Sequence, residues 1–388
     1  MREPKQAFSD SPPAPNSGGV RVSLPDRQSG EPTLSPDAPL TPPELGAGGP
    51  QTPRRTFGPE EKVRVALVGA GGWGRQHARV FSARPDVELC AVAGRTRERT
   101  EVRAREFGLR AYTDIREMIE RERPDLVSLS LPNQGHFEAT IQVIRAGVPA
   151  LLVEKPLVFD LAEADTLLAE ADARGLFFAI NFNHRYSRPH QMAKQAIDDG
   201  RLGDLVFATW RFGGEGSSDH PHANLIETQC HGFDTLEWLC GPIRSVMAEM
   251  TDKTGGGFRT LALALGFANG AVGSLVGTYD SSYAYTPGTH LLEVNGTKGR
   301  LVVEDTVRRY TFQPAGGETR EVWEAGYFND RDRAFHQTFD AHLADVLRAV
   351  REGAEPPVHA RAGRRALVLA RAAIHSFERG ERVSVEPV

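Results

Sequence analysis

The sequence has few cysteines, no excess of basic residues and no long apolar run. Its three cysteines, Cys90, Cys230 and Cys240, are too few and too widely spaced for a disulfide framework, which favours a reducing compartment. A formal net charge of -5 argues against a nucleic-acid-binding protein, which needs a basic surface. No stretch reaches the roughly 20 apolar residues that a membrane-spanning helix requires. These absences predict a cytoplasmic protein with neither nucleic acid nor a membrane as its partner.

The composition is that of a globular protein: 40% of the 388 residues are apolar and 25% are charged, and the length is sufficient for two domains. Residues 1–61 differ from the rest, because they are rich in proline, serine and glycine and poor in large apolar side chains. Such a segment cannot bury enough surface to offset its chain entropy, so we expect a disordered leader. Within it, RRTF at residues 54–57 resembles a twin-arginine export signal, but GPEEK follows where an apolar stretch is required. Export is therefore kept only as an alternative.

The first chemical motif is GAGGWG at residues 69–74, which follows a valine-rich run at residues 63–68. Its G-x-G-x-x-G spacing allows a tight turn at the first glycine, close approach of the backbone to a pyrophosphate at the second, and close packing of a helix at the third. The spacing alone is a weak signal, because it also occurs by chance in loops. Here strand-like and helix-like segments alternate as far as residue 180, which predicts a parallel sheet with helices on both faces. The cofactor-binding candidates in this motif are Gly69, Gly71, Gly72, Trp73 and Gly74.

This alternation predicts an α/β dinucleotide-binding domain of the Rossmann type, which we place at residues 62–182. Asp114 and Asp160 support its helix boundaries, since each is followed three residues later by a glutamate, the spacing of a capping box. Helices should therefore begin directly after the two aspartates. The carboxyl ends of the strands then meet at one edge of the sheet, where ligands of open parallel sheets bind.

The choice of cofactor depends on the end of the second strand, where an acidic residue would bind the ribose hydroxyls of NAD. The chain instead reads AVAGRTRER, with Gly94 in the place of the acid and Arg95 and Thr96 directly after it. Without a carboxylate there is no repulsion of a 2′-phosphate, and a guanidinium could pair with that phosphate. We therefore expect NADP in preference to NAD. The alternative is that the arginines, Arg97 and Arg99 above all, only solvate the first turn of the next helix.

Three blocks of sequence carry a resemblance to a known family: GAGGWG, then SLPNQGHFEATIQVIRAGVPALLVEKPL, then NFNHRYSRPHQMAKQAIDDGRLGDL. Together they resemble the glucose-fructose oxidoreductase and inositol dehydrogenase family of nicotinamide-dependent dehydrogenases. The resemblance runs in order from about residue 63 to the C-terminus, and EKP at residues 154–156 is its most specific element. It implies an enzyme that moves a hydride between nicotinamide and a hydroxyl-bearing carbon.

Lys155 and its neighbours are the residues to which the resemblance assigns the active site. In such enzymes the lysine of EKP points into the active site and hydrogen-bonds the reacting hydroxyl, so Lys155 would be both a catalytic and a substrate-binding residue. An ammonium group there can lower the pKa of the alcohol and stabilise developing alkoxide character. The cofactor side of this site would include Lys155 itself, Glu154, Pro132, Asn133 and His136. His136 could equally be a residue at a helix start without a ligand.

A second group of polar residues, Glu227, His231 and Asp234, is spaced at i, i+4 and i+7, on one face of an expected helix. His231 is the candidate general acid and base, because an imidazole titrates near neutral pH and a neighbouring carboxylate can orient it. The family usually has an aspartate where this chain has Glu227, so the substrate class does not carry over. We expect Glu227 and Asp234 to orient the catalytic pair, with Glu227 and His231 also contacting substrate. The alternative is a polar stripe on a helix without a catalytic role.

Metal binding has to be weighed, because His220, His222 and Cys230 lie near Glu227 and His231 in the sequence. The last two could share a helix face, but the remaining spacing matches no zinc motif. We expect no metal, with zinc as the alternative.

Further substrate contacts are expected from the segment after the sixth strand, which the resemblance places at the cleft. Its polar residues are Asn181, Asn183, His184, Arg185 and Tyr186. The sequence does not decide which of them touch substrate. We select Asn183, Arg185 and Tyr186, of which Arg185 matches the arginine that the family usually has.

Strand-like runs dominate after Gly203 and predict a second domain, of the α+β class, over residues 183–388. Asn-Gly pairs at residues 269–270 and 295–296 are hairpin signals, where positive backbone angles are needed. Successive hairpins predict a large, open, mostly antiparallel sheet.

One face of that sheet should pack on helices, such as those expected at residues 332–352 and 361–377. An apolar opposite face is costly in a monomer, so we expect a homodimer or homotetramer that forms through the sheet. The domain would then serve both substrate binding and dimerisation.

The function that these features predict is NAD(P)-dependent oxidation or reduction of a sugar, cyclitol or related polyol. Two other functions stay open. A protein of the same fold could use tightly bound cofactor transiently in hydrolysis or elimination of a glycoside, or could hold the cofactor as a regulatory ligand without turnover.

Overall fold

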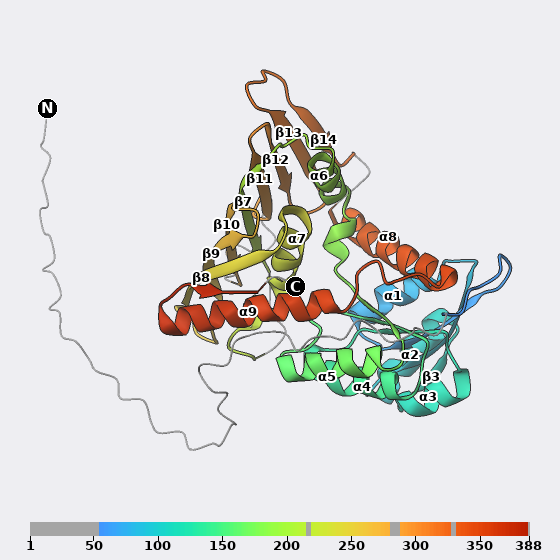
Figure 1. Ribbon diagram of the computed structural model, residues 1–388. Helices are drawn as coiled ribbons and strands as arrows, with labels where there is room; N and C mark the ends of the chain where they lie inside the picture. Colours follow the sequence, from blue (N-terminus) through green and yellow to red (C-terminus); the bar gives the residue numbers. More distant parts are fainter. Residues whose placement is uncertain (1–53, 215–218, 280–287, 327–330, 387–388) are drawn as a thin grey trace, which may run out of the picture. The chain divides into compact units, whose positions relative to one another are not determined.

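The computed structural model of the protein describes residues 54–214, 219–279, 288–326 and 331–386. The expected leader lies outside these ranges as far as residue 53. The described part of the chain is built on two β-sheets (Figure 1). The first has the strand order β3-β2-β1-β4-β5-β6, and the second has the order β14-β13-β12-β11-β7-β10-β9-β8-β15.

The first sheet is the expected parallel sheet, with every neighbouring pair of strands parallel. Its strands are β1 (Val63–Val68), β2 (Val87–Ala93), β3 (Arg110–Tyr112), β4 (Leu126–Leu129), β5 (Ala150–Val153) and β6 (Phe177–Ile180). The helices between them are α1 (Gly72–Ser82), α2 (Arg97–Phe107), α3 (Ile115–Glu122), α4 (His136–Arg145) and α5 (Leu161–Asp172). The strand order reverses between β1 and β4, which makes the carboxyl ends of these two strands the switch point where ligands of such sheets bind.

Local sequence signals explain these elements. All residues of β4, β5 and β6 are buried, as expected for strands that helices cover on both faces. The Asp114 side chain accepts a hydrogen bond from the backbone N–H of Glu117 at 2.7 Å, and Asp160 accepts one from Glu163 at 3.1 Å. The predicted helix starts after both aspartates are therefore confirmed.

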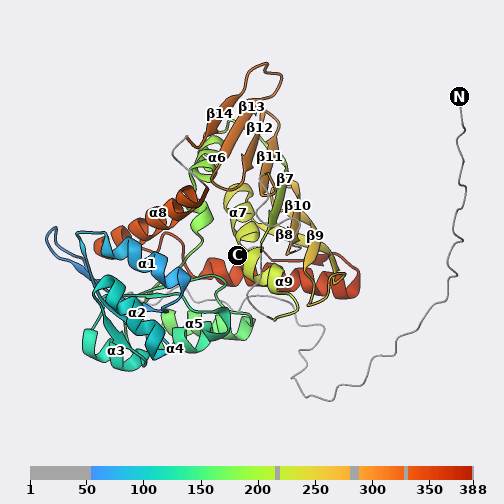
Figure 2. The same ribbon diagram turned by 180° about the vertical axis from the view of Figure 1, so that it is seen from behind.

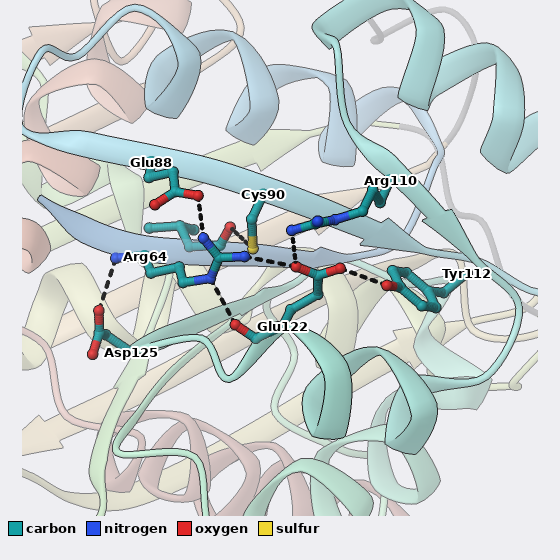
Figure 3. A network of polar contacts seen from close by, with 8 residues as sticks. Arg64, Glu88, Cys90, Arg110, Tyr112, Glu122 and Asp125 are labelled. Carbon is teal, nitrogen blue, oxygen red and sulfur yellow. Dashed lines mark hydrogen bonds and ion pairs between the residues drawn. The ribbon is translucent and has the colours of Figure 1, made fainter.

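A network of charges joins the strands near their amino ends (Figure 3). The buried carboxylate of Glu122, at the end of α3, accepts hydrogen bonds from Arg64, Arg110 and Tyr112. Arg64 lies 2.7 Å from one Glu122 oxygen and also pairs with Glu88 on β2. Because these residues lie at the opposite edge from the switch point, the network holds strands and helix together without touching the ligand edge.

The second sheet is mostly antiparallel, as the hairpin signals predicted. Its strands are β7 (Leu205–Gly213), β8 (Ile243–Thr251), β9 (Thr260–Phe267), β10 (Val272–Thr278), β11 (Leu291–Gly296), β12 (Gly299–Glu304), β13 (Arg309–Pro314), β14 (Glu321–Glu324) and β15 (Val383–Ser384). Among the described strand pairs of this second sheet, only β7 and β10 are parallel.

The two Asn-Gly signals have different outcomes. Gly270 has a φ of 89° in the turn between β9 and β10, so that prediction is confirmed. Asn295 and Gly296 instead form the end of β11, and the chain turns after them, so the prediction of positive angles there is wrong. Gly296 is needed for close packing, because a Cβ atom at this position would lie 2.2 Å from the carbonyl oxygen of Leu202.

The helices of the second half divide between the two sheets. Three of them contact the second sheet: α6 (Arg188–Asp198), α7 (Cys230–Cys240) and α9 (Arg361–Arg379). The expectation for residues 361–377 is thus confirmed. In contrast, α8 (Arg331–Glu352) lies beside α1, as both views show, and its Phe339 and Leu343 share a core with Leu67 and Phe177 of the first sheet (Figures 1 and 2). The expectation that residues 332–352 cover the second sheet is therefore wrong.

Residues 54–61, the end of the expected leader, contact the last turn of α8. The backbone N–H of Phe57 donates to the carbonyl of Arg351 at 3.0 Å, and Arg351 donates to the carbonyl of Gly58 at 2.6 Å. Arg54 donates to the carbonyl of Ala354 at 3.0 Å.

In the described ranges, no helix has the length and apolar character of a membrane span.

Candidate active site

The glycine motif occupies the switch point between β1 and α1. Gly69 has a φ of 121°, and a Cβ atom there would lie 2.1 Å from the carbonyl oxygen of Ser130. A Cβ atom at Gly74 would lie 2.0 Å from the carbonyl oxygen of Gly69, whereas nothing lies within 4 Å of the corresponding point at Gly71. The turn, the close packing and the open backbone are the three conditions that the motif requires. They leave the first amides of α1 open to a phosphate group.

A cavity of about 310 Å³, here called the loop cavity, adjoins this motif. Its lining combines Gly69 and Gly71 with Gly94, Arg95, Thr96 and Arg99 after β2 and Pro132 after β4. A Cβ atom at Gly94 would lie 2.4 Å from the hydroxyl of Thr100, so a larger residue there would require the Thr100 side chain to move. Arg97 turns away and pairs with Glu101 at 3.9 Å. The alternative role, solvation of the first turn of α2, therefore fits Arg97, whereas Arg95 and Arg99 line the cavity.

The loop after β4 holds its residues differently from the sequence expectation. Pro132 lines the loop cavity, whereas Asn133 begins a short turn, η1 (Asn133–Gly135), and lines a neighbouring hollow. His136 is fully buried, with Nδ1 2.7 Å from the carbonyl oxygen of Pro156 and Nε2 2.9 Å from that of Leu131. Both ring nitrogens are thus occupied by backbone. His136 ties two loops together, and its expected cofactor contact stays a prediction that these partners do not favour.

Glu154 ends β5 in a buried polar cluster. Its Oε1 atom lies 2.8 Å from Nε2 of His77 and accepts a hydrogen bond from Asn181 at 2.6 Å. Nδ1 of His77 lies 2.7 Å from the hydroxyl of Ser128, and Asn181 lies 2.6 Å from Nδ1 of His342. Burial raises the pKa of Glu154, but the hydrogen bonds from His77 and Asn181 and the charge of the adjacent lysine outweigh it, and the net pKa is lowered. Glu154 is therefore a carboxylate at neutral pH.

Lys155 directs its ammonium group away from that cluster. Nζ donates to the backbone carbonyl of Glu227 at 3.2 Å. Among the described residues, no carboxylate lies within ion-pair distance of it. The charge is thus held by a carbonyl dipole and is not neutralised, which leaves it available to a ligand oxygen.

A second cavity of about 470 Å³, here called the central cavity, lies at Lys155. It brings together five of the expected site residues from separate elements. These are Trp73 from α1, Glu154 and Lys155 after β5, Asn183 from the short turn η2 (Asn183–Tyr186), and His231 from α7. Glu227, Asp234, Arg185 and Tyr186 are not part of its described lining.

His231 is a nearly buried imidazole in the wall of the central cavity. Its Nδ1 atom is fully buried and has no hydrogen-bond partner among the described residues, so only Nε2 can reach a substrate. The ring stacks on His184, with centroids 3.9 Å apart and planes 6° apart. Burial first, then the charges of Lys155 and His190, lower its pKa well below 6.5. His231 is therefore a neutral base at neutral pH.

The two carboxylates expected to orient His231 have other positions. Asp234 accepts two hydrogen bonds from Arg185, at 2.8 and 2.6 Å, so its role in orienting the catalytic pair stays a prediction that these partners do not favour. Burial raises the pKa of Asp234, and Arg185 opposes this effect. Glu227 lies in η3 (Asn224–Thr228), a π-helical turn before α7, and contacts Lys155 through its backbone carbonyl. The wider turn breaks the i, i+4, i+7 register that an unbroken α-helix would have given.

Two other candidates contact α8. Asn183 donates to the Thr338 hydroxyl at 2.7 Å while also lining the central cavity, and Tyr186 donates to Asp345 at 2.7 Å. The substrate contacts of Arg185 and Tyr186 thus stay predictions that their present partners do not favour. No cluster of three or more potential metal ligands occurs in the part of the chain that the structure describes.

Sequence reasoning missed much of the cavity wall. The residues added by the structure are Phe212, Thr228, His290, Asp305, Thr306, Val307, Phe335 and Phe339. Phe335 and Phe339 lie one helical turn apart on α8, a signal that a core helix gives equally well. Asp305 and Thr306 follow β12 with φ values of 50° and 58°, which no residue type in that stretch announces.

Comparisons with known proteins agree with this geometry. A family described as "Oxidoreductase family, NAD-binding Rossmann fold" matches residues 63–182, and "Oxidoreductase family, C-terminal alpha/beta domain" matches residues 194–385. The chain is 25% identical to a myo-inositol 2-dehydrogenase of Thermotoga maritima, over 84% of this chain and 99% of the relative. It is 27% identical to an inositol 2-dehydrogenase of Rhizobium meliloti, over 83% and 99% respectively. A structure of levoglucosan dehydrogenase in complex with NADH and L-sorbose has a TM-score of 0.76 at 19% identity, covers 84% of this chain and 100% of its own, and shows the shared fold.

Proposed function

The chain belongs to the oxidoreductase family of glucose-fructose oxidoreductase and inositol dehydrogenase. From this membership we propose that it moves a hydride between a nicotinamide cofactor and a hydroxyl-bearing carbon of a sugar, cyclitol or related polyol. The observation that carries the proposal is the convergence of Lys155 and His231 on one cavity. One supplies an ammonium group without a carboxylate partner, and the other supplies a neutral base.

The residues divide the work of alcohol oxidation between them. Lys155 holds the substrate oxygen and stabilises the negative charge that develops on it. His231 takes the hydroxyl proton at Nε2 as the carbon–oxygen double bond forms. When bound, the cofactor supplies the acceptor for the hydride, which leaves the carbon with its electron pair. Since His231 is neutral at neutral pH, the site is poised for oxidation of an alcohol.

The described lining of the central cavity suits an uncharged polyol. Aromatic rings of Trp73, Phe212 and Phe335 offer faces for the C–H surface of a sugar ring, and Asn183 and Thr306 offer polar groups for its hydroxyls. Lys155 is the single lysine or arginine in this described lining. The curated relatives named as inositol 2-dehydrogenases support the same substrate class.

A panel of free sugars and cyclitols, offered with each oxidised cofactor, tests the proposal through the absorbance of the reduced cofactor. We expect turnover with at least one polyol and its loss by roughly a hundredfold or more in His231→Ala. Product without a net change in cofactor absorbance would point instead to transient use of the cofactor. Undiminished turnover in His231→Ala would remove the histidine from the mechanism.

For the cofactor itself, we propose a preference for NADP. Gly94 leaves no carboxylate to repel a 2′-phosphate, and Arg95 and Arg99 line the loop cavity beside it. The levoglucosan dehydrogenase structure holds NADH, so the family fold alone does not determine the choice. Fluorescence titration with NADPH and NADH compares the two directly.

We expect NADPH to bind about tenfold or more tightly than NADH, and Arg95→Asp to abolish that difference. Arg97→Asp is the matched control, because Arg97 pairs with Glu101 and does not line the cavity. Equal affinities in the wild type would assign the site to both cofactors.

We also propose a cytoplasmic location, which agrees with the buried, free cysteines. A further proposal is that the protein forms a homodimer through the open face of the second sheet. Phe207 on β7 and Val272 on β10 are register partners, with 38% and 59% of their surface exposed. The double variant Phe207→Glu/Val272→Glu should sediment as a monomer, while Val102→Glu, an equally exposed site on α2, should keep the wild-type mass. A wild-type monomer at micromolar concentration would contradict the dimer.

A further inference from the structure

Among the described residues, His184 has the ring that lies nearest to the candidate base. Its imidazole lies parallel to that of His231, at 3.9 Å between centroids and 6° between planes. Both rings line the central cavity, and both are buried. Parallel contact over a whole ring fixes the plane of each partner, because any rotation of one ring about its Cβ–Cγ bond collides with the other.

The described residues do not supply the usual device for orienting a catalytic histidine. That device is a carboxylate that accepts a hydrogen bond from Nδ1, which fixes both the tautomer and the ring plane. Nδ1 of His231 is buried without a hydrogen-bond partner among the described residues. Asp234, which follows it on α7, is engaged twice by Arg185. The orientation of His231 must therefore come from packing.

His184 is itself held firmly enough to serve as that support. It lies in η2 between two anchored residues: Asn183 donates to Thr338 of α8, and Arg185 pairs with Asp234 of α7. Its other ring contacts are edge-on, with Phe212 at 5.3 Å and Phe335 at 6.2 Å, or tilted, with His190 and Trp210 both at 6.2 Å. Phe182 also contacts the His231 ring edge-on, with centroids 5.8 Å apart.

We propose that His184 is a positioning residue, whose stacked ring fixes the plane of His231 so that Nε2 faces the substrate oxygen held by Lys155. The proposal rests on the proposed function of His231 as the base. It assigns to a neutral ring the task that a carboxylate performs in other histidine sites.

A consequence for proton transfer follows from the surroundings of the pair. The charged or titratable groups that act on it from the packed elements are Lys155 after β5, His190 on α6 and His290 just before β11. Burial and these neighbours lower the pKa of both stacked histidines. Among the described residues, no hydrogen bond or ion pair joins His231 to a carboxylate, so a proton that it accepts has no such partner and passes on to solvent. The ring plane, and not a strong base, has to make the transfer efficient.

Two substitutions of His184 separate stacking from proton exchange. His184→Phe keeps a flat ring and removes both nitrogens, whereas His184→Leu removes the flat ring. We expect kcat to stay within about threefold in the phenylalanine variant and to fall about tenfold to a hundredfold in the leucine variant, with KM nearly unchanged. His375→Leu, on α9 outside the cavity, is the matched control and should keep wild-type kcat.

Combination with His231→Ala adds a readout that general damage to the fold would not give. If His184 acts through His231, His184→Leu should not lower kcat further once His231 is absent. An equal loss of kcat in His184→Phe and His184→Leu would overturn the proposal, because it would make the ring nitrogens essential. Unchanged kcat in both variants would overturn it as well.

The imidazole NMR signals of His231 test the stacking without any substrate. In the wild type, the ring current of His184 should shift the Cε1–H proton of His231 upfield, and His184→Leu should remove that shift while His184→Phe keeps it. A wild type without turnover but with this pattern would refute the proposed function and leave the stacking intact. Turnover with an identical signal in all three proteins would refute the stacking alone.

Discussion

The two edges of the first sheet both bury a glutamate, but they treat its charge in opposite ways. At the amino edge, Glu122 is surrounded by Arg64 and Arg110, so opposite charges neutralise one another (Figure 3). At the carboxyl edge, Glu154 is satisfied by His77 and Asn181. Lys155, the next residue, forms no ion pair with it in the described structure.

The difference separates charges that hold a fold together from charges that are kept for a ligand. A buried ion pair that is complete within the protein has no affinity left for a substrate. In the described structure the Glu154 carboxylate accepts hydrogen bonds from His77 and Asn181 and meets no arginine or lysine side chain, and the Lys155 ammonium group donates to a backbone carbonyl. The carboxyl edge therefore places in the lining of the central cavity a carboxylate without an arginine or lysine side-chain partner and an ammonium group without a carboxylate partner among the described residues, where the proposed function would bring a nicotinamide and a hydroxyl together.

The largest effect should follow from removing the free ammonium group. Lys155→Met keeps the length of the side chain but cannot stabilise an alkoxide, so we expect kcat to fall by roughly a thousandfold. Lys194→Met, on α6 where the lysine pairs with Asp198, is the matched control and should be nearly neutral. Steady-state kinetics on the best polyol checks both. A loss below about tenfold for Lys155→Met would place the reacting hydroxyl elsewhere.

The next effect distinguishes the two buried glutamates directly. Glu154→Gln keeps the shape of the side chain and removes the negative charge next to the cavity, so the oxidised, positively charged nicotinamide should bind about tenfold more weakly relative to the reduced form. Glu122→Gln should leave that ratio unchanged and lower the free energy of unfolding by about 2 kcal/mol, since it breaks a buried ion pair. Titration with both redox forms and denaturant unfolding supply the two readouts.

Equal effects of Glu154→Gln and Glu122→Gln would contradict the proposed difference between the two edges of the sheet. If Glu122→Gln changed the cofactor ratio, the amino edge would be coupled to the site. If Glu154→Gln changed stability alone, its charge would be structural.

The sequence predicted the first sheet well because its signals are local. The capping aspartates Asp114 and Asp160, and the glycines of the motif at residues 69–74, act through neighbours in the chain. The placement of α8 failed because an amphipathic helix reveals an apolar stripe but not which sheet it covers. The Asn-Gly pair at residues 295–296 failed because a glycine needed for close packing looks the same as one needed for a turn.

The candidate site was predicted in its residue types and only partly in its contacts. Lys155 and His231 line one cavity, as expected. The pairing of Asp234 with Arg185 joins residues 49 positions apart, which helical spacing could not reveal. The stack of His184 on His231 depends on two elements whose relative placement comes only from the fold. Sequence periodicity locates groups on an element, whereas orientation between elements is a property of packing.

The smallest effect is a difference in the pH dependence of stability, and it should belong to the carboxyl edge. His342 lies in the Glu154 cluster, where its Nδ1 atom contacts Asn181. Burial lowers its pKa to about 3, and the charge of Glu154 only partly opposes this effect, so His342 is uncharged at neutral pH. The unfolded chain binds this proton below about 6.5, and the folded protein does not until the pH approaches 3. The stabilising contribution is therefore complete above pH 6.5 and is lost as the pH falls from there toward 3, at about 1.4 kcal/mol per pH unit. In His342→Gln, which keeps a donor for Asn181 but cannot titrate, the loss of unfolding free energy between about pH 7 and pH 5 should be about 2 kcal/mol smaller than in the wild type. Parallel pH profiles for the two proteins, measured by urea unfolding, would mean that His342 is already protonated in the folded state.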